Sequence, residues 1–213
     1  MKAFESIVKG IKSFKILKPY NVIDDILKCV ELNLPNFISS KEFVDITRIK
    51  KNENQHSAAL CVFLNFHSHK NICFSREGSQ KGSSTIDIVV YAGSKVVFTI
   101  EAKILPTPLT SSRRTEQEYV YGTGAGIQRF RDGNHGLDDQ NVPLNQSGLI
   151  AYIKEEEFVD WHKKINQWIV DASWPKSEAL EKLYFNSVAR LSSEHIRVDN
   201  STIKLHHFWI KVR

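Results

Sequence analysis

The sequence predicts a mixed α/β fold in which helices flank a central β-sheet. Two apolar runs rich in β-branched residues, 86–91 and 96–100, are joined by a short turn that contains Gly93, a pattern typical of a β-hairpin. A buried strand is expected at 147–153 after a helical crossover, which predicts that it lies parallel to the second hairpin strand. Apolar side chains spaced for one helical face predict an amphipathic helix at 155–172.

The other expected elements follow from periodicity, turn residues and capping residues. They are helices at 3–17 and 22–30, a helix at 53–64, a strand at 71–76, a helix that starts at Ser111 or Ser112 and runs through Tyr119, a short helix at 178–185, and a terminal β-hairpin at 194–210. Asn21 is the expected N-cap of the second helix, which should end before Pro35. Because no internal repeat, linker or low-complexity segment interrupts this order, we expect a single domain over residues 1–213.

Length and composition restrict the class of protein. A chain of 213 residues with 41% hydrophobic content can bury a substantial core. No run of about eighteen apolar residues is present, so we expect no transmembrane helix and no membrane partner. Lysines interrupt the apolar residues of the N-terminus, which argues against a secretory signal, and Cys29, Cys61 and Cys73 lack metal-type spacing and cannot all pair. These features predict a reduced, cytoplasmic setting, and the net charge of +5 is compatible with a polyanionic partner.

Three charged residues at the ends of the hairpin strands are the first candidates for a functional site. Glu101 and Lys103 are two residues apart in a strand, so their side chains share one face, and Asp87 on the partner strand can lie opposite or diagonal to Glu101. Two carboxylates that converge at the end of an apolar sheet suit Mg²⁺, which binds a few carboxylates and keeps water in the rest of its shell. The neighbouring ammonium is placed to hold an attacking water or to stabilise charge in a transition state. A buried salt bridge between the strands is the structural alternative.

The same residues carry a resemblance to a nuclease family. Asp87 followed by Glu101-Ala102-Lys103 resembles the motif of the PD-(D/E)XK superfamily, the restriction-endonuclease-like nucleases, with Ile86 where the name of the motif has proline. The resemblance implies a restriction-endonuclease-like core, to which the N-terminal helices and the C-terminal hairpin would be additions. It also implies Mg²⁺ bound by Asp87, Glu101 and the backbone carbonyl of Ala102, with Mn²⁺ as a substitute, and a catalytic role for Lys103.

The resemblance covers roughly residues 53–153 and assigns roles to residues outside the hairpin. Glu53, near the start of the helix before the sheet, matches a glutamate that reaches toward the metal in this superfamily and completes a second metal position or acts on the water; Glu42 is its competitor. Gln128 matches a polar residue that positions the water, and Arg129 is expected to contact backbone phosphate. A first-turn glutamate favoured by the helix dipole, and a surface Gln-Arg pair, are the structural alternatives.

Further contacts to phosphate are expected near two loops. Arg76 and Lys81, at the end of the strand at 71–76 and in the loop after it, can meet a phosphate group, although solvent-exposed loop charges are the simpler interpretation. The glycines of 122–126 precede a short helix, where backbone N–H groups can approach a phosphate.

We therefore expect a Mg²⁺-dependent nuclease that hydrolyses phosphodiester bonds, with DNA as the expected substrate and RNA as the other nucleic acid that the residues allow. By resemblance, small nucleases of this type occur in restriction and phage-defence settings, and a homodimer or a partner subunit is compatible with the sequence. Two hypotheses compete with this one. The first is a catalytically inactive nuclease-fold subunit that binds nucleic acid or docks onto a larger complex, and the second is a structural protein whose charged residues form an ion-pair network.

Overall fold

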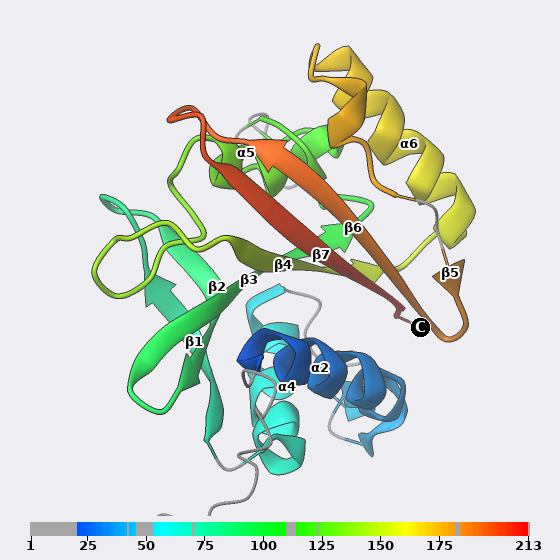
Figure 1. Ribbon diagram of the computed structural model, residues 1–213. Coiled ribbons are helices and arrows are strands. Elements are labelled where there is room, and N and C mark those ends of the chain that lie inside the picture. Colours follow the sequence, from blue (N-terminus) through cyan, green and yellow to red (C-terminus); the bar gives the residue numbers. More distant parts are fainter. Residues whose placement is uncertain are drawn as a thin grey trace, which may run out of the picture.

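A seven-stranded mixed β-sheet forms the centre of the molecule (Figure 1). The computed structural model describes residues 21–41, 43–45, 53–69, 71–109, 114–122, 124–181 and 184–212. Along the sheet the strands follow the order β1-β2-β3-β4-β7-β6-β5. Their bounds are Ile72–Ser79 (β1), Thr85–Ala92 (β2), Lys95–Leu105 (β3), Gln146–Ile153 (β4), Tyr184–Phe185 (β5), Val188–Ile196 (β6) and Thr202–Lys211 (β7).

The sheet joins two antiparallel sets of strands through a parallel centre. β1, β2 and β3 are antiparallel neighbours, and β5, β6 and β7 form the second antiparallel set. β4 lies between β3 and β7 and is parallel to both. The mixed sheet, the parallel arrangement of the second hairpin strand with the strand at 147–153, and the terminal hairpin are therefore confirmed.

Helices cover both faces of the sheet and create two apolar cores (Figure 1). The helices are α2 (Val22–Ser39), α4 (Glu53–His67), α5 (Ile127–Arg131) and α6 (Phe158–Asp171), with two short 3-10 helices, η1 (Glu116–Tyr119) and η2 (Lys176–Glu178). Successive strand residues point to opposite faces, so in β4 Ile150 joins the core under α2 and α4, while Leu149 and Ala151 join the core under α5 and α6. The helices predicted at 53–64 and 155–172 are confirmed.

The helix α2 continues through Pro35, whereas the sequence predicts that it ends before that residue. A proline inside a helix removes one backbone hydrogen bond and crowds the preceding turn. Val30 and Leu34 before the proline and Phe37 after it are all fully buried in the same core. Burial of this continuous apolar stripe offsets the local cost, because tertiary packing contributes more to helix stability than intrinsic propensity does. Asn21 is the N-cap residue as predicted, but its side chain makes no capping hydrogen bond.

The helix predicted at 178–185 is wrong. In the described part of this range, the one helical element is the 3-10 helix η2, which ends at Glu178. The short strand β5 then pairs with β6 at the edge of the sheet. Pairing with a strand that comes later in the chain satisfies backbone groups in a way that no local pattern reveals.

Some predictions fall on residues outside the described part of the chain. These are the helix at 3–17, the candidate Glu42 and the helix starts at Ser111 and Ser112. Downstream of those serines, the described residues form the single 3-10 turn η1, which follows an extended residue, Thr115.

A chain of buried hydrogen bonds ties η1 to the C-terminal hairpin. Nε1 of Trp209 can only donate, and it donates to the hydroxyl of Tyr119 at 3.0 Å, which in turn lies 2.7 Å from Nδ1 of His207. The hydroxyl of Ser193 then lies between Nε2 of His207 at 2.8 Å and Nε2 of His195 at 2.7 Å. These partners fix the position of η1 against β6 and β7.

The three cysteines are all unpaired: Cys61 is buried, Cys29 is half-buried and Cys73 is exposed. Burial raises the pKa of the Cys61 thiol to about 12, so this thiol stays protonated. Within the described part of the chain, no helix combines the length and the apolar character that are needed to cross a membrane.

Candidate functional site

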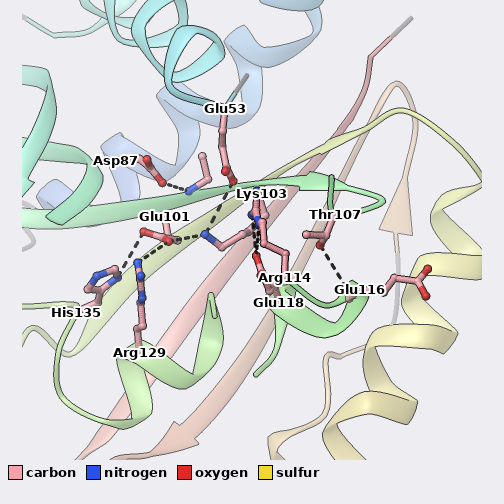
Figure 2. A network of polar contacts seen from close by, with 11 residues as sticks. Glu53, Asp87, Glu101, Lys103, Thr107, Arg114, Glu116, Glu118, Arg129 and His135 are labelled. Carbon is pink, nitrogen blue, oxygen red and sulfur yellow. Dashed lines mark hydrogen bonds and ion pairs between the residues drawn. The ribbon is translucent and has the colours of Figure 1, made fainter. Parts of the chain in front are cut away.

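The candidate site lies where β2 and β3 separate (Figure 2). Toward the site, the backbone pairing of the two strands runs as far as Ile88 with Ile100. Next to that pair, Oδ2 of Asp87 accepts a hydrogen bond of 2.7 Å from the backbone N–H of Ala102. The aspartate side chain thus replaces backbone pairing at this point. Asp87 also lies close to Glu101, because the charge of Glu101 adds to the effect of burial in raising the pKa of Asp87.

Glu101 and Lys103 form a buried ion pair on one face of β3. Nζ of Lys103 lies 2.6 Å from Oε1 of Glu101. The glutamate side chain is 3% exposed and the lysine side chain is 7% exposed. Ala102 between them belongs to the core under α2 and α4. The structure therefore brings together Asp87, Glu101 and Lys103, the three residues on which the sequence-based hypothesis depends.

Glu53 reaches the ion pair from the first turn of α4. Its Oε1 atom lies 3.9 Å from Nζ of Lys103, and its side chain is 21% exposed. Figure 2 shows the side chain extending from the helix toward Lys103. The predicted position of Glu53 beside the hairpin is reproduced, and the ion-pair partner that it finds there is the lysine.

The short helix α5 contributes Arg129, and not Gln128, to this cluster. NH1 of Arg129 lies 3.5 Å from Oε1 of Glu101, and the arginine side chain is 36% exposed. Oε1 of Gln128 instead accepts a hydrogen bond of 3.1 Å from the backbone N–H of Gly122. Neighbouring residues of a helix point in different directions, so the sequence match to Gln128 could not show which of the two reaches the strand.

The backbone N–H groups around the start of α5 are used within the protein. The N–H of Gly126 donates to the carbonyl of Glu118 at 2.7 Å, and the N–H of Gln128 donates to the carbonyl of Val120 at 2.9 Å. The expectation that the backbone N–H groups at 122–126 approach a phosphate is therefore wrong for Gly126, whose N–H group already has a partner within the protein.

His135 belongs to the cluster, although the sequence analysis identifies no functional residue in that loop. Its side chain is fully buried, and Nδ1 lies 3.4 Å from Oε2 of Glu101. The ring stands edge-on to Phe130, with the ring centroids 5.7 Å apart. Burial, followed by the charges of Arg129 and Lys103, lowers the pKa of His135 to about 3, and a contact with the backbone of Thr85 opposes this shift only in part.

Arg114 and Glu118 extend the cluster on the side of η1. Nε and NH2 of Arg114 donate to Oε2 of Glu118 at 2.9 and 2.7 Å. Glu118 is almost fully buried, and its other oxygen, Oε1, has no hydrogen-bond partner among the described residues. The charges of both residues influence the pKa of Glu53, which places the pair near the start of α4. The sequence analysis includes Glu118 only as part of a helix.

Burial and crowding shift the pKa values of the central groups. Burial, followed by the charge of Glu101, raises the pKa of Asp87 to about 7. Burial also raises the pKa of Glu101 and of Glu53 against the opposing charge of Lys103. Burial alone would lower the pKa of Lys103, but the surrounding carboxylates outweigh it and raise that pKa above its usual range. Lys103 is therefore a permanent cation at neutral pH.

Comparisons with protein-family models, with curated proteins and with solved structures find no match for this chain.

Acidic side chains outnumber basic ones in the cluster. Glu53, Asp87, Glu101 and Glu118 lie around Lys103, Arg114 and Arg129, so one carboxylate has no cationic counterpart. A divalent cation would offset both the burial and the mutual repulsion that raise the pKa values of Glu53, Asp87 and Glu101. In the part of the chain that the structure describes, no three His, Cys, Asp or Glu side chains are arranged as a metal site. Asp87 and Glu101 still fit Mg²⁺, because this ion is usually held by one or two carboxylates and keeps several waters.

Arg76 and Lys81, the two other predicted phosphate contacts, do not join the cluster. Arg76 is exposed on β1 and pairs with Glu77 at 2.8 Å. Lys81 is exposed in the turn between β1 and β2. Among the described residues, no hydrogen bond or ion pair connects Arg76 or Lys81 to the carboxylates of the cluster. The geometry therefore agrees with the simpler interpretation of solvent-exposed loop charges.

Proposed function

We propose that the protein is a divalent-metal-dependent nuclease with a restriction-endonuclease-like core, which hydrolyses phosphodiester bonds in DNA. The observation that supports this proposal is the buried convergence of Asp87, Glu101 and Lys103 where two strands of the sheet separate. These residues also carry the resemblance to the PD-(D/E)XK superfamily. The excess of carboxylates suits a cation, and the neighbouring basic side chains suit an anionic substrate.

Asp87, Glu101 and the backbone carbonyl of Ala102 would hold Mg²⁺, for which Mn²⁺ would substitute. The bound ion supplies a polarised phosphate and a water of lowered pKa. Lys103 remains charged, so it donates hydrogen bonds to the water or to the phosphate oxygens and does not act as a base. Glu53 orients the water from the side of α4.

Arg129 has a separate task in the proposed mechanism. Its guanidinium lies at the accessible edge of the cluster, where it is shared between Glu101 and solvent. A phosphate group that reaches this edge can accept charge-assisted hydrogen bonds from the guanidinium. Arg129 therefore positions the substrate beside Lys103.

Cleavage assays test the proposal. Purified protein is incubated with plasmid, single-stranded DNA and RNA, each with Mg²⁺, Mn²⁺ or EDTA, and cleavage of DNA that depends on the divalent ion is expected. Lys103→Ala should abolish cleavage, a loss of at least about 10²-fold, and should leave DNA binding nearly intact. Lys103→Met, which keeps the volume of the side chain, serves as a second variant, and Lys95→Ala at the exposed first residue of β3 is the control. Ion-dependent nicking by the Lys103 variants at the wild-type rate would refute the assignment.

A catalytically inactive nuclease-fold subunit, which binds nucleic acid or docks onto a larger complex, is the second candidate. It is favoured by the fact that Lys103 already neutralises Glu101 and that the backbone of Ala102 already satisfies Asp87. Calorimetric titration with Mg²⁺ or Mn²⁺ separates the two functions. The nuclease should show saturable binding that Asp87→Asn removes, whereas the inactive subunit should bind no ion here.

The biological setting is a further part of the proposal. A role in restriction or phage defence, as a homodimer or with a partner subunit, is supported by the resemblance alone. A preference for plasmid DNA over RNA in the cleavage assay would agree with that setting, and a preference for RNA would contradict it.

A further inference from the structure

The imidazole of His135 lacks the partners that a buried polar ring requires. The side chain is fully buried, and apart from the contact with the backbone of Thr85, neither ring nitrogen makes a hydrogen bond of normal geometry to the described part of the chain. A buried polar group without a partner is destabilising, because it has lost its hydrogen bonds to water. Figure 2 shows the ring directed at Glu101, whose Oε2 atom lies 3.4 Å from Nδ1. A ligand shared by these two atoms would supply the missing partner.

The distance between Nδ1 of His135 and Oε2 of Glu101 distinguishes a shared ligand from a direct hydrogen bond. N–H···O hydrogen bonds measure about 2.7–3.2 Å, and the observed 3.4 Å is longer. Two atoms that each lie about 2.1 Å from one ion are about 3.0 Å apart at an octahedral angle and about 3.4 Å apart at a tetrahedral angle. The observed separation therefore fits two ligands of one ion.

We infer that Nδ1 of His135 and Oε2 of Glu101 are two ligands of one divalent ion, and that the nitrogen makes the site select a first-row transition ion such as Mn²⁺ or Co²⁺ over Mg²⁺. The inference rests on the proposed function only in taking this ion to be the one that serves cleavage. Imidazole is a ligand for transition ions, whereas Mg²⁺ prefers oxygen. Asp87 and the carbonyl of Ala102 remain the other proposed ligands of this ion, and water fills the rest of its shell.

The other oxygen of Glu101 is already occupied. Lys103 lies 2.6 Å and Arg129 lies 3.5 Å from Oε1, so both cations are on the side of that atom. The opposite oxygen, Oε2, faces His135. The carboxylate can therefore keep its ion pairs and still offer a lone pair to an ion on the side of the imidazole.

The loop that carries His135 is held firmly enough to present a ligand. The backbone N–H of His135 donates to the carbonyl of Arg129 at 3.1 Å. On the other side, the amide side chain of Gln80 makes hydrogen bonds of 3.0 and 3.2 Å to the N–H and carbonyl of Leu137. The edge of the ring is fixed against Phe130. Such support lowers the cost of ordering a ligand around an ion.

Pulsed electron paramagnetic resonance of the Mn²⁺-loaded protein tests the inference directly. A nitrogen ligand produces a hyperfine coupling to Mn²⁺ that changes when the protein is labelled with ¹⁵N. We expect this coupling in the wild type and in the control His67→Gln, an exposed histidine of α4, and we expect its loss in His135→Gln. Absence of the coupling from the wild type, or its persistence in His135→Gln, would overturn the inference.

Ion affinities measured by calorimetry give an independent readout. His135→Gln should weaken Mn²⁺ binding by about 10-fold or more and change Mg²⁺ binding by less than about 3-fold. Equal weakening of Mn²⁺ and Mg²⁺ binding would show that His135 only positions Glu101, which would overturn the inference. Failure of the wild type to bind Mn²⁺ would overturn it as well. If His135→Gln does not fold, His135→Asn replaces it, and the isotope effect in the wild type still shows whether nitrogen is bound.

The cleavage assay separates this inference from the proposed function. Mn²⁺ bound through nitrogen by a protein that cuts no nucleic acid would refute the nuclease and leave the ligand assignment standing. Conversely, Mg²⁺-dependent cleavage without nitrogen coupling would refute the ligand assignment and leave the nuclease standing.

Discussion

Removal of the buried ammonium of Lys103 tests whether charge holds the cluster together. Nζ lies 2.6 Å from Oε1 of Glu101 and 3.9 Å from Oε1 of Glu53. At an effective dielectric constant of about 20, the attraction between Lys103 and Glu101 alone is about 6 kcal/mol, before the cost of withdrawing both groups from water. Loss of one partner of a buried pair costs about 3–5 kcal/mol, so we expect Lys103→Met to lower the free energy of unfolding by that amount.

The charge balance predicts a smaller loss when the partner carboxylate is removed. Glu101→Gln leaves Lys103 with Glu53 and Asp87 as counter-charges and removes the repulsion between Glu101 and these two carboxyl groups. We therefore expect a cost of about 1–2 kcal/mol. The double variant Lys103→Met/Glu101→Gln replaces both charges by side chains of similar volume. It should lower the free energy of unfolding by about 1–2 kcal/mol, well below the sum of the two single losses.

Urea unfolding followed by circular dichroism, near neutral pH and with EDTA present, measures these free energies. Lys95→Met at the exposed first residue of β3 is the matched control and should change stability by less than about 0.5 kcal/mol. Strict additivity in the double variant would refute the argument. A cost below about 1 kcal/mol for Lys103→Met would refute it as well.

A methyl group at Gly126 would lie 2.7 Å from the backbone oxygen of Tyr119 and 2.9 Å from Cδ2 of Leu149. Gly126→Ala should therefore lower the free energy of unfolding by about 1–3 kcal/mol. Gly133→Ala is the control and should cost less, because a methyl group there meets open space and only the positive φ of the residue costs about 1 kcal/mol. Equal losses for the two variants in urea unfolding would contradict the packing argument. Burial, then the charges of Lys204 and Arg190, lowers the pKa of His206 to about 4 against the opposing charges of Asp24 and Glu181. The unfolded chain takes up a proton near the ordinary pKa of 6.5 and the folded protein does not, so the stability that His206 contributes is present above that pH and is lost as the pH falls toward 4. Between about pH 7 and pH 5 this loss should reach about 2 kcal/mol, and His206→Gln should flatten the pH profile of urea unfolding by that amount; an unchanged profile would show that His206 has an ordinary pKa.

The hairpin and its charged ends could be predicted because their signals are local. The β-branched runs of β2 and β3 and the turn at Gly93 lie within one short stretch of chain, and the alternation of strand side chains puts Glu101 and Lys103 on the same face. Glu53 follows in the same way from the start of a helix, because α4 begins at that residue.

Arg114, Glu118 and His135 could not be found in this way. Each lies in a short or irregular element, and each reaches the cluster through the packing of that element against the sheet. The choice between Gln128 and Arg129 has the same origin, since it depends on how a helix of five residues is turned. Apolar periodicity over so few residues does not show which face of the helix lies against the sheet.

The sequence by itself determined the order of most strands and helices, and it placed two carboxylates and an ammonium at the ends of one hairpin. Only the tertiary structure decided which distant side chains surround Glu101, that α2 continues through Pro35, and that an imidazole faces a carboxylate oxygen. The physical reason is that strand alternation acts between residues close in the chain. The surroundings of a buried charge, in contrast, are set by the contacts between elements that the chain brings together only when it folds.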